Sequence, residues 1–414
     1  MERRSFRCAY FLAALLVWQA GGLFAAPRGG STVMLQGFHW TSWKTAPWWS
    51  IVKSKAGEIS GAGINMVWLP PSSDSLAEEG YLPRKLSVQD SKYGTAAQLS
   101  SAISALHGRG VKVIADVVIN HRVGTGGWAD FTEPAWGPDS ITSDDEWGKG
   151  EGTADTGKGV PFARDIDHTK AYVRDGLKSW LKNLKDVSGY DGWRYDYARG
   201  YGAGYMLEYN RASSPVFAVA EVWDDLDPNN SDAHRRALSD WVGSVNGEIK
   251  VFDFTTKGVL QQAVGSGEYW RLKDSRGRPS GLIGLQPENA VTFVDNHDTG
   301  PSPGIRLKEN AWPFPSDKVM QGYAYILTHP GVPCVYWPHL FDWGLKEEIS
   351  SLIRLRRQAG VTASSGVSIV KAENGIYAAL VNGKLAVSLG AAWDPGPGWS
   401  SAARGAGYQV WLKN

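Results

Sequence analysis

Cysteine and net charge are both scarce in this sequence, and each absence excludes a class of protein. The 414 residues include two cysteines, Cys8 and Cys334, and Cys8 lies in an N-terminal segment that we expect to be removed. The single remaining thiol cannot form an internal disulfide framework. The 43 Lys and Arg residues balance 42 Asp and Glu residues to a net charge of +1. This balance gives no electrostatic basis for binding nucleic acid or a membrane.

The apolar run near the N-terminus is too short to span a membrane. It reads YFLAALLVW at residues 10–18, follows Arg3 and Arg4, and precedes the small residues of GGLFAAPRGG. This order is typical of a secretory signal peptide, so we expect residues 1–26 to be a signal peptide and the protein to be secreted. A plastid transit peptide is the alternative interpretation, although an apolar run after the early arginines fits it less well.

No G-x-G-x-x-G follows the first expected strand, which argues against a doubly wound dinucleotide-binding sheet. Instead, eight short apolar or β-branched runs alternate with helical segments, and several runs are continuously apolar, as strands covered on both faces tend to be. This alternation predicts an α/β fold, a (β/α)₈ barrel, which needs roughly 250 residues plus insertions. The expected strands are residues 33–38, 65–71, 111–120, 192–197, 216–223, 250–254, 290–296 and 332–337, and the clearest helices are 96–110, 171–186, 316–329 and 345–357.

Two regions interrupt the alternation. Residues 122–165 are rich in Gly, Asp and Trp without a helical pattern, which indicates a loop-rich subdomain inserted after the third strand. Residues 361–414 hold short alternating runs, which indicate a small antiparallel β domain. The barrel itself would then comprise residues 27–121 and 166–360.

Carboxylates follow three of the expected strands. Asp196, Glu221 and Asp298 each lie at a strand end, and a fourth end supplies His121. A closed barrel brings its strand ends around one mouth, where catalytic groups of such barrels gather. Each residue alone has a simpler structural interpretation, such as an ion pair, a helix cap or a turn. Their coincidence at separate strand ends favours an active site.

Strand alternation assigns different environments to two of these acids. Arg194 and Asp196 share a strand face, so the guanidinium would keep the neighbouring carboxylate ionised, as a nucleophile requires. Glu221 ends a run of Ala and Val, and apolar surroundings would keep its proton, as a general acid requires. Two acids with opposite shifts are the pattern of a retaining glycosidase, in which the carboxyl groups lie about 5–5.5 Å apart.

Four short segments carry a family resemblance: DVVINH at 116–121, GWRYDYARG at 192–200, AVAEVW at 218–223 and FVDNHD at 293–298. Together with LQGFHW and EGYLP, and in this order, they resemble the α-amylase family of glycoside hydrolases, most of all its plant-type members. The resemblance covers the chain from about Val33 to its end.

The resemblance implies a role for each site residue. Asp196 would be the nucleophile, Glu221 the general acid and base, and Asp298 the transition-state stabiliser. Arg194 would hold Asp196 ionised, and Tyr81 would stack on the sugar. The further residues expected to contact substrate are His121, His297, Trp40, Trp223 and Arg199, of which both tryptophans also suit a structural role.

The resemblance also implies at least one structural Ca²⁺ ion between the inserted subdomain and the barrel. Oxygen ligands suit this ion. The matching positions are Asn120, Asp155 and Asp165 through side chains, and Lys158 and Gly200 through backbone carbonyls. Further ions have weaker support, at Asp144 and Asp145.

One departure from plant members, one match to them and one glycosylation motif remain to be described. Leu285 and Gln286 replace the adjacent tryptophans of a surface starch site in cereal enzymes, so we expect that site to be lost. Tyr377 matches a C-terminal tyrosine that contacts sugar, and a buried strand tyrosine is an equal alternative. Asn229 begins a sequon, Asn-Asn-Ser.

The sequence therefore predicts a secreted, monomeric, calcium-dependent α-amylase. Starch and malto-oligosaccharides are the expected partners, hydrolysed at internal α-1,4 bonds with retention of configuration. Transglycosylation by the same site is one alternative, and a non-catalytic glucan-binding protein on the same scaffold is another.

Overall fold

The computed structural model describes residues 31–227, 229–304 and 311–414. The expected signal peptide at 1–26 and Cys8 lie outside these residues. Within the described ranges, no helix is both long and apolar enough to cross a membrane.

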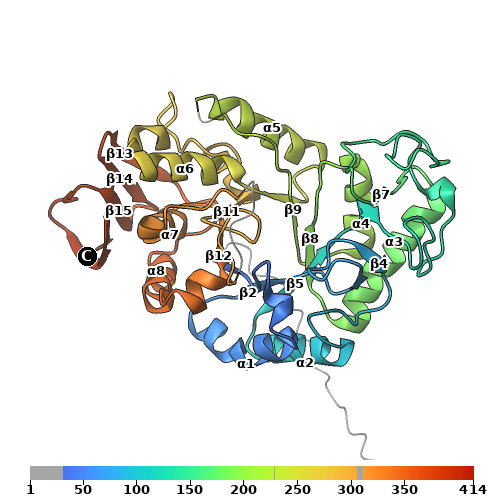
Figure 1. Cartoon of the computed structure of the whole chain (residues 1–414). Helices are drawn as coiled ribbons and strands as arrows, with labels where there is room; N and C mark the ends of the chain where they lie inside the picture. The colour runs from blue at the N-terminus through green and yellow to red at the C-terminus, as the bar shows by residue number, and fades with distance from the viewer. Residues whose placement is uncertain (1–30, 228, 305–310) are drawn as a thin grey trace, which may run out of the picture.

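The described residues form a closed barrel of eight parallel strands, which confirms the predicted fold class (Figure 1). Every strand is short and mostly buried, because helices cover its outer face and side chains fill the interior. Each of the eight predicted runs contains one strand of the barrel. In chain order the strands are β1 (Met34–Gln36), β2 (Met66–Leu69), β5 (Lys112–Val117), β8 (Gly192–Tyr195), β9 (Phe217–Ala220), β10 (Lys250–Phe252), β11 (Ala290–Phe293) and β12 (Val332–Tyr336).

Helices surround the barrel, and half of them were expected from amphipathic patterns. The expected ones are α2 (Ala96–His107), α3 (Ala171–Asn183), α7 (Val319–Thr328) and α8 (Lys346–Gln358). The helices not expected are α1 (Trp48–Gly61), α4 (Ala203–Ser213), α5 (Ser231–Ser244) and α6 (Phe254–Ser266). Helix α6 shows why: most of its residues are buried on all sides, so its sequence has no polar face to mark a helical period.

The inserted segment leaves the barrel after β5 and returns before α3 (Figure 1, right). Its two ends pair antiparallel as β6 (His121–Arg122) and β7 (Arg164–Asp165), which puts His121 opposite Asp165. Arg122 anchors the loop between them, since its guanidinium lies 4.7 Å from the ring centroids of both Phe131 and Trp136. The inserted segment also contains η2 (Pro138–Ser140), while β3 (Asp74–Ser75) and β4 (Pro83–Lys85) lie between β2 and α2, and η3 (Leu184–Ser188) follows α3.

A five-stranded antiparallel sheet follows the barrel, as predicted, and packs against α7 and α8. Tyr377 lies in this sheet fully buried, with its hydroxyl 2.7 Å from His329 Nε2, so it is a structural strand tyrosine and not a surface contact. The strands are β13 (Val367–Glu373), β14 (Ile376–Val381), β15 (Leu385–Gly390), β16 (Trp399–Gly405) and β17 (Tyr408–Lys413).

Short helical turns complete the rim and the outer surface. They are η1 (Ser42–Lys44), η4 (Tyr269–Leu272), η5 (Leu282–Gly284), η6 (Pro287–Asn289), η7 (Ser316–Lys318) and η8 (Pro338–Asp342).

Candidate active site

A single buried guanidinium joins three acidic side chains at the mouth of the barrel. Arg194 Nη1 lies 2.9 Å from Asp116 Oδ1 and 2.5 Å from Asp196 Oδ1. Arg194 Nη2 lies 2.6 Å from Glu221 Oε1. The sequence predicted the contact with Asp196 alone. The structure corrects this, because β8 and β9 are neighbours in the barrel and Glu221 directly follows β9.

Burial dominates the acid–base properties of this cluster. It raises the pKa of Glu221 to about 8, although Arg194 acts in the opposite direction. Burial likewise raises the pKa of Asp116 to about 7. The backbone N–H of Tyr197 donates to Glu221 Oε2 at 3.1 Å and fixes the carboxyl group. Burial therefore favours the protonated form of Glu221, which is the form that a general acid uses.

Asp116 is a site residue that sequence reasoning missed. It stands opposite Arg194 in the β5–β8 pairing. Its Oδ2 accepts hydrogen bonds from Trp68 Nε1 at 3.1 Å and from the Tyr81 hydroxyl at 2.9 Å. The signal was present in DVVINH, but finding the pair requires the register between two strands that lie far apart in the sequence.

The opposite wall of the mouth carries aromatic rings and Asp298. The Tyr81 hydroxyl lies 2.8 Å from His297 Nε2, which in turn lies 3.2 Å from Asp298 Oδ2. Trp40 and Tyr81 stack with an angle of 4° between their planes, and the centroids of their rings are 5.8 Å apart. His121 Nε2 lies 2.8 Å from the carbonyl oxygen of Tyr81.

Asp196 and these residues line a pocket of about 150 Å³. Phe162 and Tyr197 line it and were not predicted. Phe162 is 51% exposed and meets the His121 ring edge to face at a centroid distance of 5.4 Å. The pocket is lined by Trp40, Tyr81, His121, Phe162, Asp196, Tyr197, His297 and Asp298.

Four predicted site residues do not line this pocket: Glu221, Arg194, Trp223 and Arg199. Trp223 stacks on Phe254 at a centroid distance of 5.0 Å, which is a packing role. Arg199 pairs with Asp224 at 2.9 Å and lies over the Tyr197 ring, 5.1 Å from its centroid. The side chains of Trp223 and Arg199 therefore pack outside the pocket.

The predicted calcium positions converge where the inserted segment meets the barrel. Asn120 Nδ2 donates to Asp165 Oδ1 at 3.1 Å. Gly200 lies against the same amide, since a Cβ atom placed there would fall 1.9 Å from Asn120 Oδ1. Gly159 lies between Asp155 and Asp165, because a Cβ atom on it would be 3.2 Å and 2.4 Å from their respective Oδ2 atoms.

One acidic oxygen at this junction lacks a donor. Asp155 Oδ2 is buried and finds no hydrogen-bond partner among the described residues. Burial and the nearby acids raise the pKa of Asp165 to about 7 and also raise that of Asp155. Asp145, Glu146 and Asp165 form a group that could hold a metal ion, although Arg164 pairs with the first two. The donor set suits a hard cation.

Comparison with known proteins agrees with this geometry. Residues 50–148 match the family described as "Alpha amylase, catalytic domain", and residues 358–412 match the "Alpha-amylase C-terminal beta-sheet domain". The chain is 42% identical to "Probable alpha-amylase 2" of Arabidopsis thaliana over 403 residues, which cover 93% of this chain and 95% of that protein. It is 40% identical to "Alpha-amylase 3, chloroplastic" of the same plant over 92% of this chain and 44% of that protein.

Solved structures support the fold. An α-amylase from Malbranchea cinnamomea superposes with a TM-score of 0.67 at 19% identity, over 93% of this chain and 96% of that one.

Proposed function

The chain belongs to the α-amylase family of glycoside hydrolases and hydrolyses starch, and we propose that Asp196, Glu221 and Asp298 carry out this reaction with retention of configuration. The observation that carries the proposal is the shared guanidinium of Arg194, which holds the first two carboxyl groups on adjacent nitrogen atoms. Two carboxyl groups that contact one guanidinium lie near each other, as direct attack by one carboxylate requires.

The chemistry follows from the environment of each group. Asp196, beside the cation, attacks the anomeric carbon while Glu221 gives its proton to the glycosidic oxygen, and the leaving glucan departs as an alcohol. Glu221, now ionised, takes a proton from water, whose oxygen attacks the same carbon and frees the Asp196 carboxylate. Asp298 and His297 bind sugar hydroxyl groups on the opposite wall and hold the ring as positive charge develops.

The test combines product stereochemistry with capture of the intermediate. Proton NMR on maltoheptaose should show α-anomers released first, because two displacements restore the configuration. In Glu221→Gln, an activated maltoside that needs no proton should accumulate a glycosyl group on Asp196, detectable by mass spectrometry. First release of β-anomers, or wild-type activity in Asp196→Asn, would refute the assignment. Products longer than maltoheptaose would assign transglycosylation instead.

We also propose that residues 122–165 form a subdomain that holds Ca²⁺ against the barrel. Asn120, Asp155 and Asp165 would supply side-chain oxygens, and the backbone carbonyls of Lys158 and Gly200 would complete the set. The unpartnered oxygen of Asp155, buried in the described part of the chain, supports this proposal. A bound ion would tie the inserted segment to the loop after Asp196. Calorimetry with and without a chelator tests it, since the folded protein should lose thermal stability when the ion is removed.

For location, we propose that residues 1–26 direct the chain into the secretory pathway. The basic start and the short apolar run support secretion. The similarity to a chloroplastic amylase supports the plastid alternative. A fluorescent fusion to residues 1–30 decides between them, because secretory entry and plastid import place the fluorescence in different compartments.

A further inference from the structure

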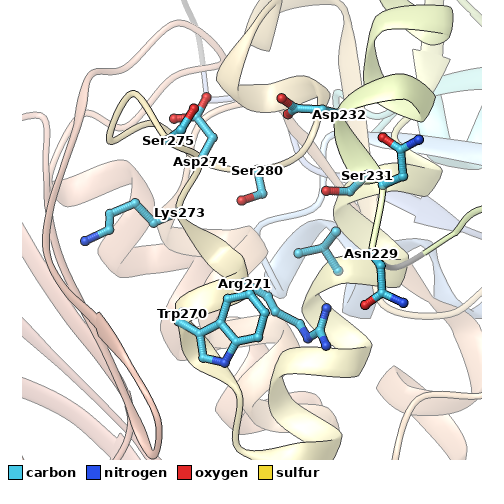
Figure 2. Close-up of a pocket in the computed structure, with 11 residues that line it drawn as sticks. Asn229, Ser231, Asp232, Trp270, Arg271, Lys273, Asp274, Ser275 and Ser280 are labelled. Atoms are coloured by element: carbon cyan, nitrogen blue, oxygen red, sulfur yellow. The ribbon is translucent and has the colours of Figure 1, made fainter.

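A second pocket lies outside the barrel mouth, where the N-terminal end of α5, the flank of α6 and the segment after η4 meet (Figure 2). Its volume is about 320 Å³, and of the residues that line it none also lines the catalytic pocket. Figure 2 shows Trp270 and Arg271 on one side, and Ser231, Asp232 and Ser280 on the other.

The aromatic side of this pocket is fixed in place. Trp270 is 46% exposed, although an indole in water forfeits the free energy of burial. The Arg271 guanidinium lies 4.5 Å from the centroid of the Trp270 ring, and Arg271 Nε donates to Glu268 Oε2 at 2.6 Å. The ring is thus held in one orientation before any ligand arrives, which lowers the entropic cost of stacking on it.

The opposite side offers hydroxyl groups that lack partners. Ser280 is 6% exposed, and within the described residues neither its hydroxyl nor that of Ser231 makes a hydrogen bond. Asn230, which precedes α5, gives that helix no side-chain cap in the described structure. Donors and acceptors therefore face the pocket without internal competition.

Most charged side chains that line the pocket are already paired. Asp232 and Asp274 both pair with Arg235 Nη2, at 2.5 Å and 2.9 Å. Arg271 pairs with Glu268, which weakens its attraction for an anion. The pocket therefore suits a neutral ligand with an apolar face and many hydroxyl groups, which is the chemistry of a sugar.

We propose that this second pocket binds a short segment of α-1,4-glucan, with a sugar ring on Trp270 and its hydroxyl groups on Ser231, Asp232 and Ser280. The choice of this sugar rests on the starch hydrolysis of the family. A long glucan could occupy both pockets, so the second contact would raise its effective concentration at the catalytic site. Small substrates would gain nothing from it.

The experiment uses Trp270→Ala with Trp128→Ala as its matched control. Trp128 is 47% exposed and lies in the inserted segment, so its removal deletes an equally exposed indole elsewhere. Both variants are made in a host that does not N-glycosylate proteins, because a glycan on Asn229 would sit at the rim of the pocket. Affinity electrophoresis in amylose gels then measures binding.

Trp270→Ala should bind amylose about tenfold more weakly, which is the loss expected from one stacking contact. Trp270→Phe should retain most of the binding, and Trp128→Ala should match the wild type. Turnover of a chloronitrophenyl maltotrioside should stay the same in all three variants. This readout separates the two proposals, since failure of the catalytic assignment would leave the amylose result unchanged.

Three outcomes would overturn the inference. Equal binding by Trp270→Ala and the wild type would show that the ring contacts no glucan. Equal weakening in Trp128→Ala would show a general effect of lost surface indoles. Displacement of amylose by inorganic phosphate, lost in Arg271→Ala, would assign the pocket to an anion instead.

Discussion

The barrel mouth and the junction with the inserted segment both gather buried carboxylates, but the two sites differ in how these carboxylates are paired. At the mouth, Arg194 contacts Asp116, Asp196 and Glu221. At the junction, Asp155 and Asp165 receive backbone N–H groups and the Asn120 amide, and one Asp155 oxygen receives nothing from the described residues.

The two sites therefore differ in whether their buried charges are paired by other groups of the chain. Buried charges are stable only when they are paired or neutralised. The mouth satisfies this rule within the chain, so its geometry should persist without any ion. The junction does not satisfy it, because one buried Asp155 oxygen has no hydrogen-bond partner among the described residues. The two sites should therefore respond differently to mutation, chelation and pH.

The largest effect is expected from a substitution that removes the shared cation, Arg194, from the mouth. Arg194→Met should lower activity on starch by about a thousandfold or more and reduce the free energy of unfolding by about 3–5 kcal/mol, because three buried carboxyl groups lose their common partner. Reducing-sugar assays and denaturant unfolding measure the two effects. Arg194→Lys keeps the positive charge but loses the planar guanidinium with its two terminal nitrogens. This variant should recover stability more than activity. Full activity in Arg194→Met would show that the shared cation is not what makes the mouth a working site.

Chelation should act on the junction alone. The loss of an ion present at about a hundred times its dissociation constant removes about 2.7 kcal/mol, or about 3 °C in Tm for a chain of 414 residues. Differential scanning calorimetry should show this drop in the wild type and in Asp196→Asn. Asp155→Asn should begin with a lower Tm and respond less to the chelator. A chelator effect of equal size in Asp155→Asn would exclude Asp155 as a ligand.

The pH dependence tests the mouth. Glu221 acts while protonated and its pKa is raised to about 8, so kcat/KM on starch should fall above pH about 8, close to tenfold for each further pH unit. An activated chloronitrophenyl maltoside, whose leaving group needs no proton, should show a weaker decline. An equal decline for both substrates would mean that Glu221 is not the acid.

The sequence predicts the strands and the carboxylates of the mouth better than it predicts the residues that these carboxylates contact. Continuous apolar runs such as MVWL of β2 mark strands that are buried on both faces, and the acids directly follow such runs. The contact between Arg194 and Glu221 could not be predicted from one strand, since it depends on the distance between two. Asp116 needed the strand register, and α6 lacked a polar face.

The junction was predicted through family resemblance, because its residues follow no regular spacing. Asn120, Asp155 and Gly200 come from three separate loops, and only the folded chain brings them together. Phe162 was missed for the same reason. Nothing in an irregular segment shows which exposed ring faces the substrate.

Phe162 connects the two regions and gives the smallest predicted effect. It belongs to the inserted segment, yet it lines the catalytic pocket beside His121. Phe162→Ala should raise KM for malto-oligosaccharides about threefold to tenfold and leave kcat near its wild-type value, because the ring contributes one stacking contact and touches no reacting atom. Tyr172→Ala, which removes another exposed ring, is the control and should leave KM unchanged. If the bound ion acts on the substrate through this ring, chelation at a temperature below unfolding should raise KM in the wild type more than in Phe162→Ala. Equal changes in both proteins would show that the ion stabilises the junction without reaching the mouth.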